Sequence, residues 1–203
     1  MSVNSMGPTG HSPIVISPDS LDILASEVRA CTRCGLSATR MQAVPSEAHL
    51  SARILLVGES PGATEDRLGR NFCGLSGKFL DRCLEQAGLS RRDVNVTPIL
   101  HCHPPGNRNP LPDEANACLT FFHRHFALVD PAIVDVMGGV DARWYLGEKS
   151  ITSIAGAWRD IEGRPHLFTY HPAAGVRFPA KREAMHAHFK ELSERARQIG
   201  ILG

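Results

Sequence analysis

The chain has 203 residues, with 22 Lys and Arg against 21 Asp and Glu, and a formal net charge of +1 at pH 7. A globular chain of this length buries about 70% of its unfolded surface, and its hydrophobic (42%) and charged (21%) fractions are ordinary. No apolar run approaches the ~20 residues that a membrane-spanning helix needs. The N-terminus lacks the basic start and apolar segment of a secretory signal, so we expect a cytoplasmic protein that does not contact a membrane.

The expected elements begin after residues 1–18, which are rich in Ser, Gly, Pro and Asn and show no apolar periodicity. We expect this stretch to be a disordered N-terminal arm, followed by a single domain over residues 19–203. A first helix is expected from near Ser20, and apolar runs that alternate with helical periodicity follow it. The expected strands are 53–57, 94–100, 132–137 and 166–170, and the expected helices are 76–87, 113–128, 140–146 and 181–198.

Local signals support these helix boundaries. Ser76 is a possible N-cap of the helix over 76–87 and Gly88 its stop, while Pro112 suits the first turn of the next helix. Strands that alternate with helices predict an α/β fold, a three-layer α/β/α sandwich around a central, mostly parallel four-stranded sheet. In such a fold the residues that bind ligands lie on loops at the carboxyl ends of the strands.

The positive charge is concentrated toward the C-terminus. From Arg164 onward there are seven Lys or Arg residues against three Glu, together with four His. A basic end on an otherwise neutral protein suits a nucleic acid that is contacted over a small area. A solvated C-terminal helix with mixed charge explains the same composition equally well.

Four of the six cysteines form a pattern that indicates a metal centre. Cys31 and Cys34 make a C-x-x-C pair, and Cys102 and Cys118 lie far away with fifteen residues between them. Four thiolates in this arrangement fit either zinc or a [4Fe–4S] cluster, and disulfides are rare in a reducing compartment. Four unrelated buried cysteines are the alternative. Cys102 opens a proline-rich loop (102–110), whose stiffness suits a residue that must hold a ligand at a fixed point.

A Gly-Glu-Ser-Pro-Gly turn at 58–62 follows the first expected strand. Its carboxylate, Glu59, can act as a general base, position a water molecule or face a developing cation. A turn residue that caps the strand end is the alternative. Phe72 follows, flanked by small residues, and can stack on a planar ligand, an interaction worth ~1–3 kcal/mol for a base. A phenylalanine buried in the core is the alternative for this residue.

The expected helix that begins with Ser76, Gly77 and Lys78 has the small residues and the single cation of an anion-binding N-terminus. It lacks the G-x-x-x-x-G-K-[ST] spacing of a nucleotide-binding P-loop, and Phe79 stands where a metal-binding hydroxyl is required. The sequence therefore predicts a contact with one backbone phosphate at this helix start.

A His-Pro motif follows the last expected strand. His171 precedes Pro172, and a residue before proline avoids the helical region, so the imidazole is held extended at the strand end. There it can donate a hydrogen bond to the oxygen of a leaving group, although a lone histidine is more often structural. The residues beyond form a small apolar tip bracketed by basic side chains, as a wedge into a base stack requires. They are Gly175, Val176, Arg177, Lys181 and Arg182.

Taken together, these segments resemble the uracil-DNA glycosylase superfamily, most closely its iron–sulfur members, the family-four enzymes. The resemblance covers about residues 20–195 and rests on the joint occurrence of several motifs. They are the turn 58–62, the acidic pair Glu65–Asp66, the stretch 69–74, the Ser76–Gly77 helix start, the loop 102–108, Cys118 and the segment His171–Arg177.

The resemblance implies a DNA glycosylase that flips uracil out of DNA and hydrolyses its N-glycosidic bond. This reaction starts base excision repair, releases the free base and leaves an abasic site. The resemblance also implies a structural [4Fe–4S] cluster bound by Cys31, Cys34, Cys102 and Cys118. The sequence gives no sign of oligomerisation, so a monomer is expected.

The resemblance also assigns roles to residues around the base. Glu59 faces the sugar and the attacking water, Phe72 stacks on the flipped base, and His171 donates to the base O2 as the bond breaks. The remaining residues are expected to contact the base or the DNA backbone. Those for the base are Gly58, Ser60 and Pro98, with Phe72, and those for DNA are Ser76, Gly77, Lys78, Arg108, Val176, Arg177, Lys181 and Arg182.

The chain departs from the family pattern in its base-recognition pocket. Where family members carry a Thr-Asn pair whose amide reads the base edge and excludes cytosine, this chain has Thr97 and Pro98. We therefore expect a relaxed pocket that also accepts hypoxanthine, xanthine or other deaminated or damaged bases. Asn71 replaces the proline that normally precedes Phe72. The small apolar tip predicts weak insertion into duplex DNA, which favours single strands or mismatches.

Two other functions compete with this interpretation. A lesion or abasic-site binder would keep the fold without turnover, but the presence of both Glu59 and His171 argues against it. A small iron–sulfur electron carrier would need a signature for a flavin or a docking partner, and the sequence has none. Zinc in place of the cluster is a separate alternative.

Overall fold

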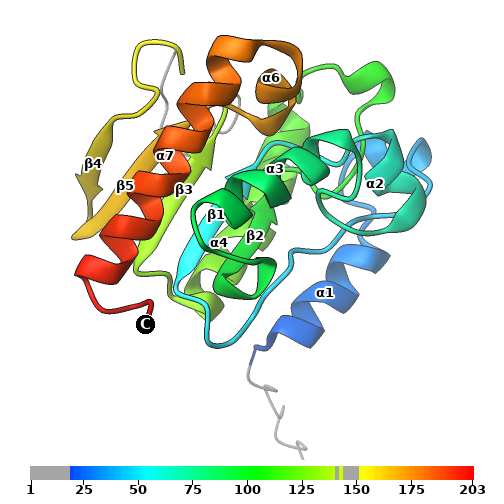
Figure 1. The fold of residues 1–203 in the computed structure, drawn as a ribbon. Helices are drawn as coiled ribbons and strands as arrows, with labels where there is room; N and C mark the ends of the chain where they lie inside the picture. Colours follow the sequence, from blue (N-terminus) through cyan, green and yellow to red (C-terminus); the bar gives the residue numbers. More distant parts are fainter. Residues whose placement is uncertain (1–18, 140–141, 144–150) are drawn as a thin grey trace, which may run out of the picture.

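The computed structural model describes residues 19–139, 142–143 and 151–203. Its strands form a five-stranded sheet in the order β2-β1-β3-β5-β4 (Figure 1). β1 pairs in parallel with β2 and β3, β3 pairs in parallel with β5, and β4 runs antiparallel to β5 at one edge. The strands are β1 (Ile54–Gly58), β2 (Val94–Pro98), β3 (Ile133–Met137), β4 (Trp158–Ile161) and β5 (Arg164–Thr169).

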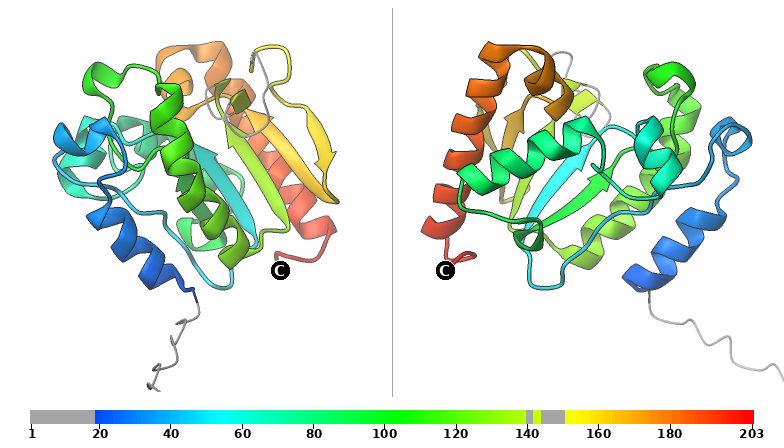
Figure 2. Two further views of the ribbon diagram at one scale, coloured as in Figure 1. Left: turned by 180° about the vertical axis from the view of Figure 1, so that it is seen from behind. Right: turned by 45° about the vertical axis from the view of Figure 1, so that its right-hand side comes forward.

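Helices cover both faces of the sheet. In Figure 1, α3 and α7 lie in front of it, and the view from behind in Figure 2 places α4 across the opposite face with α1 beside it. In the described ranges no helix combines the length and apolar character that crossing a membrane requires. The helices are α1 (Leu21–Ala30), α2 (Ala63–Leu68), α3 (Leu75–Gln86), α4 (Pro112–Val129), α6 (Pro172–Arg177) and α7 (Pro179–Gln198), with 3₁₀ turns at Gly35–Ala38, Arg91–Asp93 and Pro105–Asn107.

The apolar core has a layer on each face of the sheet. Successive residues of β1 alternate between the two layers: Ile54 and Leu56 pack with α3 and α7, whereas Leu55 and Val57 pack with α4. All four side chains are fully buried. Because a central parallel strand is covered on both faces, it reads as a continuous apolar run in the sequence.

The expected α/β/α sandwich is confirmed, but the sheet has one strand more than the four expected. The additional strand, β4, is a four-residue edge strand with no fully buried side chain, so it lacks the apolar run that marks the others. A turn at Glu162 and Gly163 joins it to β5, with φ of 53° and 78°. Left-handed conformations at both turn residues are typical of a tight hairpin.

Two local expectations are also wrong, and a third lies largely outside the described residues. The N-cap of α3 is Gly74 rather than Ser76, and the Gly74 N–H donates to the Glu65 carboxylate at 2.7 Å. The segments after β1 and β5, expected to be loops, contain the short helices α2 and α6. The helix expected at 140–146 falls largely outside the described residues.

Candidate active site

A cleft of about 390 Å³ opens at the carboxyl ends of three parallel strands. β1 ends at Gly58, β2 ends at Pro98 and β5 leads to His171, and these three residues line the cleft together. This end of the sheet faces the upper part of Figure 1, where α6 and the loop after β2 lie. The lining residues are Gly58, Glu59, Ser60, Pro61, Gly62, Glu65, Asn71, Phe72, Ser76, Pro98, Asn107, Asn109, His171, Ala173 and Arg177.

Glu59 comes directly after β1 and is half-buried in the cleft. Its backbone oxygen accepts a hydrogen bond from the Leu100 N–H at 2.9 Å, and that of Gly58 accepts one from the Ile99 N–H at 2.8 Å. The turn is thereby tied to the segment that follows β2. Burial raises the pKa of Glu59, because a poorly solvated environment disfavours the charged carboxylate.

His171 is the N-cap of α6, and its Nδ1 accepts a hydrogen bond from the Ala173 N–H at 3.2 Å. Burial lowers the pKa of His171 to about 4, against the opposing effect of Glu65, so the imidazole is neutral near pH 7. In a neutral imidazole whose Nδ1 accepts, the proton is on Nε2. His171 therefore presents an N–H donor without a positive charge.

Phe72 forms a wall of the cleft beside His171, with 5.9 Å between the two ring centroids. It is half-buried rather than enclosed in the core. Its φ of 45° is unusual for a bulky residue, and the Arg91 guanidinium donates a hydrogen bond to its carbonyl oxygen at 3.0 Å. Arg91 is also paired with Asp81 at 2.6 Å. The ring is therefore fixed as a plate that a planar ligand can stack on.

Two glycines make room for Phe72. A Cβ at Gly58 would lie 2.9 Å from Phe72 Cζ, and a Cβ at Gly77 would lie 1.6 Å from the Phe72 carbonyl oxygen. Gly77 is buried in the first turn of α3. It was expected to contact a phosphate, but the structure places it behind the backbone of Phe72, where close packing requires glycine.

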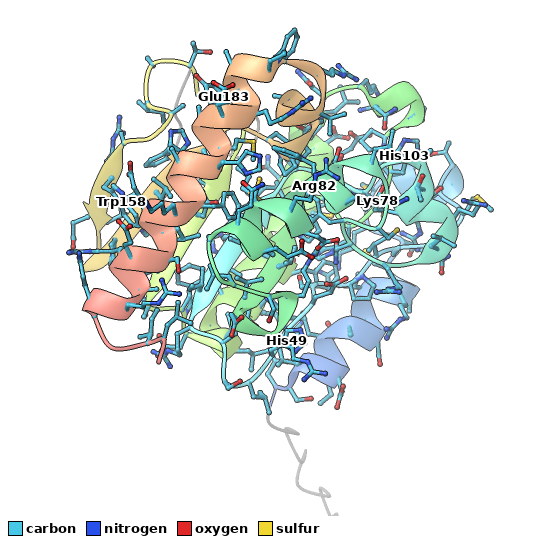
Figure 3. All side chains as sticks on the ribbon, in the orientation of Figure 1. His49, Lys78, Arg82, His103, Trp158 and Glu183 are labelled. Carbon is cyan, nitrogen blue, oxygen red and sulfur yellow. The ribbon has the colours of Figure 1, made fainter. Side chains whose placement is uncertain are left out.

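Three other residues expected to bind DNA surround the entrance. Ser76 and Arg177 line the cleft itself. Lys78 is exposed on α3 (Figure 3) and lines a neighbouring groove of about 820 Å³, which shares Phe72 with the cleft. A cation at this place can meet the backbone of a strand whose base lies in the cleft.

Arg108, also expected to bind DNA, is engaged within the protein. It donates two hydrogen bonds of 2.8 and 2.6 Å to the carboxylate of Glu114, a buried residue in the first turn of α4. This pair anchors the loop after β2 to α4. The loop brings Asn107 and Asn109 into the cleft, although neither was predicted to lie there. Nothing in the Asn-Arg-Asn sequence indicates which side chains face the cleft.

The expected apolar tip has a different residue at its surface. Val176 lies in α6 and is partly buried against the core. Phe178, at the junction of α6 and α7, is 51% exposed. The Lys181 ammonium lies 4.8 Å from the centroid of its ring, and Arg182 donates to the backbone oxygen of Gly175 at 3.2 Å. An exposed aromatic side chain bracketed by cations thus replaces the tip expected at Val176.

The four expected metal ligands meet between α1 and α4. Cys102 and Cys118 are buried there, and Cys31 and Cys34 pack against the same apolar cluster. The four thiols are close enough to interact electrostatically, and Arg40 donates a hydrogen bond to Cys102 Sγ at 3.0 Å. Across the described part of the chain, no group of three or more His, Cys, Asp or Glu side chains is arranged to hold a metal ion.

Fold and cleft together define an α/β protein that positions a carboxylate, an aromatic plate and a neutral imidazole around one cleft. Residues 45–197 match the profile of the family described as the uracil DNA glycosylase superfamily. The match covers well over half of the chain. Similar proteins also match this chain over most of their own length. The chain belongs to the uracil-DNA glycosylase superfamily.

The relatives named type-4 uracil-DNA glycosylase include proteins from three organisms that match most of this chain. The protein from Sulfurisphaera tokodaii is 37% identical over 188 residues, 88% of this chain and 86% of the relative. The protein from Saccharolobus solfataricus is 37% identical over 187 residues, 87% of this chain and 86% of the relative. The protein from Archaeoglobus fulgidus is 34% identical over 185 residues, 87% of this chain and 93% of the relative. The resemblance drawn from the motifs is confirmed.

Proposed function

We propose that this chain is a uracil-DNA glycosylase, in which residues 19–203 act as one domain that removes uracil from DNA by hydrolysis. The observation that carries the proposal is that Glu59, Phe72 and His171 line one cleft. The name of the similar proteins, which match over most of their length, supports the same activity.

The proposed reaction begins when the target base leaves the DNA stack and stacks on Phe72. As the glycosidic bond breaks, negative charge develops on the base and positive charge on the sugar. The Nε2–H of His171 donates a hydrogen bond to the base carbonyl oxygen and stabilises the departing anion while keeping its proton. Glu59, as a carboxylate, stabilises the sugar cation, positions the water that attacks it and accepts the proton that this water loses. The departing base anion takes up a proton from solvent.

The test is to incubate the protein with single-stranded and duplex oligonucleotides that carry one uracil, hypoxanthine or xanthine. Abasic sites are then measured by alkaline strand cleavage. We expect abasic sites from uracil, and from the other two bases because Pro98 leaves the pocket relaxed. Activity on uracil alone would contradict the expectation of a relaxed pocket. Binding without any cleavage would favour the non-catalytic lesion binder.

The pH profile of kcat/KM is expected to have an acid limb above the ordinary Glu value of 4.5 and no inflection near 6.5. Burial raises the pKa of Glu59. As pH falls, Glu59 is therefore protonated, and activity is lost, at a higher pH than for an exposed Glu. The pKa of His171 is lowered to about 4, so it stays neutral as pH falls through 6.5. An inflection near 6.5 that disappears in His171→Gln would contradict this assignment.

We further propose that Cys31, Cys34, Cys102 and Cys118 hold a [4Fe–4S] cluster. The donor set of four cysteine thiols suits such a cluster, and the N–H of Arg40 directed at Cys102 Sγ is a contact that cluster sulfurs commonly receive. When bound, the cluster supplies cross-links between the end of α1, the loop after β2 and α4.

Cys102→Ser is expected to abolish the broad visible absorption of the bound cluster and to lower Tm. Loss of a covalent cross-link costs about 2–4 kcal/mol, which corresponds to roughly 4–16 °C for a chain of this size. Cys73→Ser is the matched control, since Cys73 is half-buried and lies outside the set. Visible absorption retained in Cys102→Ser, or stoichiometric zinc in the wild type, would contradict the cluster.

We also propose that Phe178, rather than Val176, fills the gap that a flipped base leaves in duplex DNA. Phe178→Ala is expected to lower excision from duplex DNA about tenfold relative to single-stranded DNA, because an unpaired strand needs no wedge. Ile199→Ala is the control, since Ile199 is 41% exposed at the far end of α7. Equal losses on both substrates would show that Phe178 is not a wedge.

A further inference from the structure

The cleft has a proline at a place where a side chain could read the base edge. Pro98, at the end of β2, has no side-chain donor or acceptor. Asn71 also lines the cleft but is 6% exposed, and its amide donates to the backbone oxygen of Pro45. Its backbone N–H donates to the Glu47 carboxylate at 3.1 Å. Recognition of the base edge must therefore come from another residue.

Asn107 enters the same cleft from a loop with a fixed backbone. It closes the 3₁₀ turn Pro105–Asn107 with φ of 55°, a left-handed conformation that asparagine tolerates better than most residues. The next residue, Arg108, is held by two hydrogen bonds to the buried Glu114. Asn107 thus follows Gly106 and precedes the anchored Arg108, and its own N–H donates to the backbone oxygen of Pro104 at 3.0 Å. The backbone that carries its side chain is therefore held on both sides.

The amide of Asn107 is oriented by His103. The two lie in the same loop, with His103 Nε2 3.1 Å from Asn107 Oδ1, and Figure 3 labels His103 beside this loop. When the His103 Nε2–H donates to the amide oxygen, that oxygen is occupied. The amide NH₂ is then the group of Asn107 that remains for a ligand in the cleft.

We infer that Asn107, oriented by His103, reads a keto oxygen on the flipped base. Uracil carries this oxygen at position 4, and hypoxanthine and xanthine carry it at position 6. Cytosine and adenine carry an amino group there, which would set two donors against each other. The inference deepens the proposed function and rests on it, and it assigns bases with a keto oxygen at this position as the class that the cleft accepts. Guanine and thymine share the oxygen, so this contact separates the deaminated bases from cytosine and adenine only.

Two substitutions of Asn107 separate the contact from the fold. Asn107→Asp keeps the shape but replaces the donor with an acceptor, and Asn107→Gly removes the side chain, while both residues tolerate the left-handed backbone. We expect single-turnover excision of uracil and hypoxanthine to fall in the order wild type, Asn107→Gly, Asn107→Asp. The loss in Asn107→Asp should be about tenfold to a hundredfold, the usual range for one base-edge contact.

Discrimination between bases is measured by inhibition with free uracil and free cytosine, which needs no excision of cytosine. Asn107→Asp should reduce the preference for free uracil by at least about tenfold. In His103→Ala the amide can rotate, so the same preference should fall, and uracil excision should fall less than in Asn107→Asp, as for a positioning residue. His123→Ala, an exposed residue of α4 outside the cleft, is the control.

Each outcome supports or contradicts the assignment of Asn107 as the residue that reads the base. An active wild type with unchanged base preference in Asn107→Asp overturns this inference alone, and a change in Asn109→Ala instead would transfer the role to that residue. A wild type that makes no abasic sites from any base overturns the proposed function and this inference with it. Matching visible spectra and Tm values across the variants exclude misfolding as the cause of a loss.

Discussion

His171→Ala is expected to lower kcat for uracil excision by roughly 10²–10³, the usual cost of removing one donor aimed at developing negative charge. The lost group is the Nε2–H, whose position is fixed because Nδ1 accepts from the Ala173 N–H at 3.2 Å. The Kd for uracil-containing DNA should change little, because the contact strengthens mainly as charge develops on the base. Single-turnover rates and equilibrium binding, measured on the same oligonucleotide, separate the two effects.

Two further variants control for a structural role of this imidazole. His171 also caps α6, and loss of a cap costs about 1 kcal/mol, so Tm must be compared with the rate. His171→Gln keeps an N–H donor and should retain more activity than His171→Ala. A rate in His171→Ala equal to that of the wild type would remove the imidazole from the mechanism.

Gly77→Ala is expected to destabilise the protein by about 3 kcal/mol or more, beyond the usual cost of one added methyl group in a packed core. The new Cβ would lie 1.6 Å from the carbonyl oxygen of Phe72, so the backbone of Phe72 has to move. The aromatic plate would then lose its position in the cleft, and excision should fall together with stability. Urea unfolding gives the free energy, and the excision assay gives the activity.

Gly35→Ala is the matched control for this substitution. A Cβ at Gly35 would meet no atom within 4 Å, so only the backbone entropy of the unfolded chain changes, by less than about 1 kcal/mol. If Gly77→Ala unfolds at the same urea concentration as the wild type, α3 must shift without cost, and the packing argument for this glycine is wrong.

The fold was predictable where burial leaves a simple pattern. β1 is wholly apolar and β3 nearly so, because helices cover both faces of the sheet, and such runs are strong signals. β4 was not predicted, because an edge strand that exposes two of its four residues to solvent needs no apolar run. The N-cap of α3 was also predicted wrongly, because the Gly74 N–H donates to Glu65, a residue of a separate helix.

The candidate site was predictable where a residue is attached to a strand end by the chain itself. Glu59 and His171 follow β1 and β5 directly, so topology brings them to one edge of the sheet. Residues placed by distant contacts could not be predicted. Arg108 looked free in the sequence but is bound to Glu114, and the exposure of Phe178 depends on how α6 packs on the core.

The loop after β2 carries both a proposed metal ligand and the proposed base-reading residue in one short stretch of chain. Four residues separate Cys102 from Asn107, and Arg108 ties the same loop to α4, the helix that carries Cys118. An insertion or deletion within these residues would displace the proposed metal ligand and the proposed base reader at the same time. Over evolution, base preference in proteins built this way should therefore diversify by substitution within a loop of constant length.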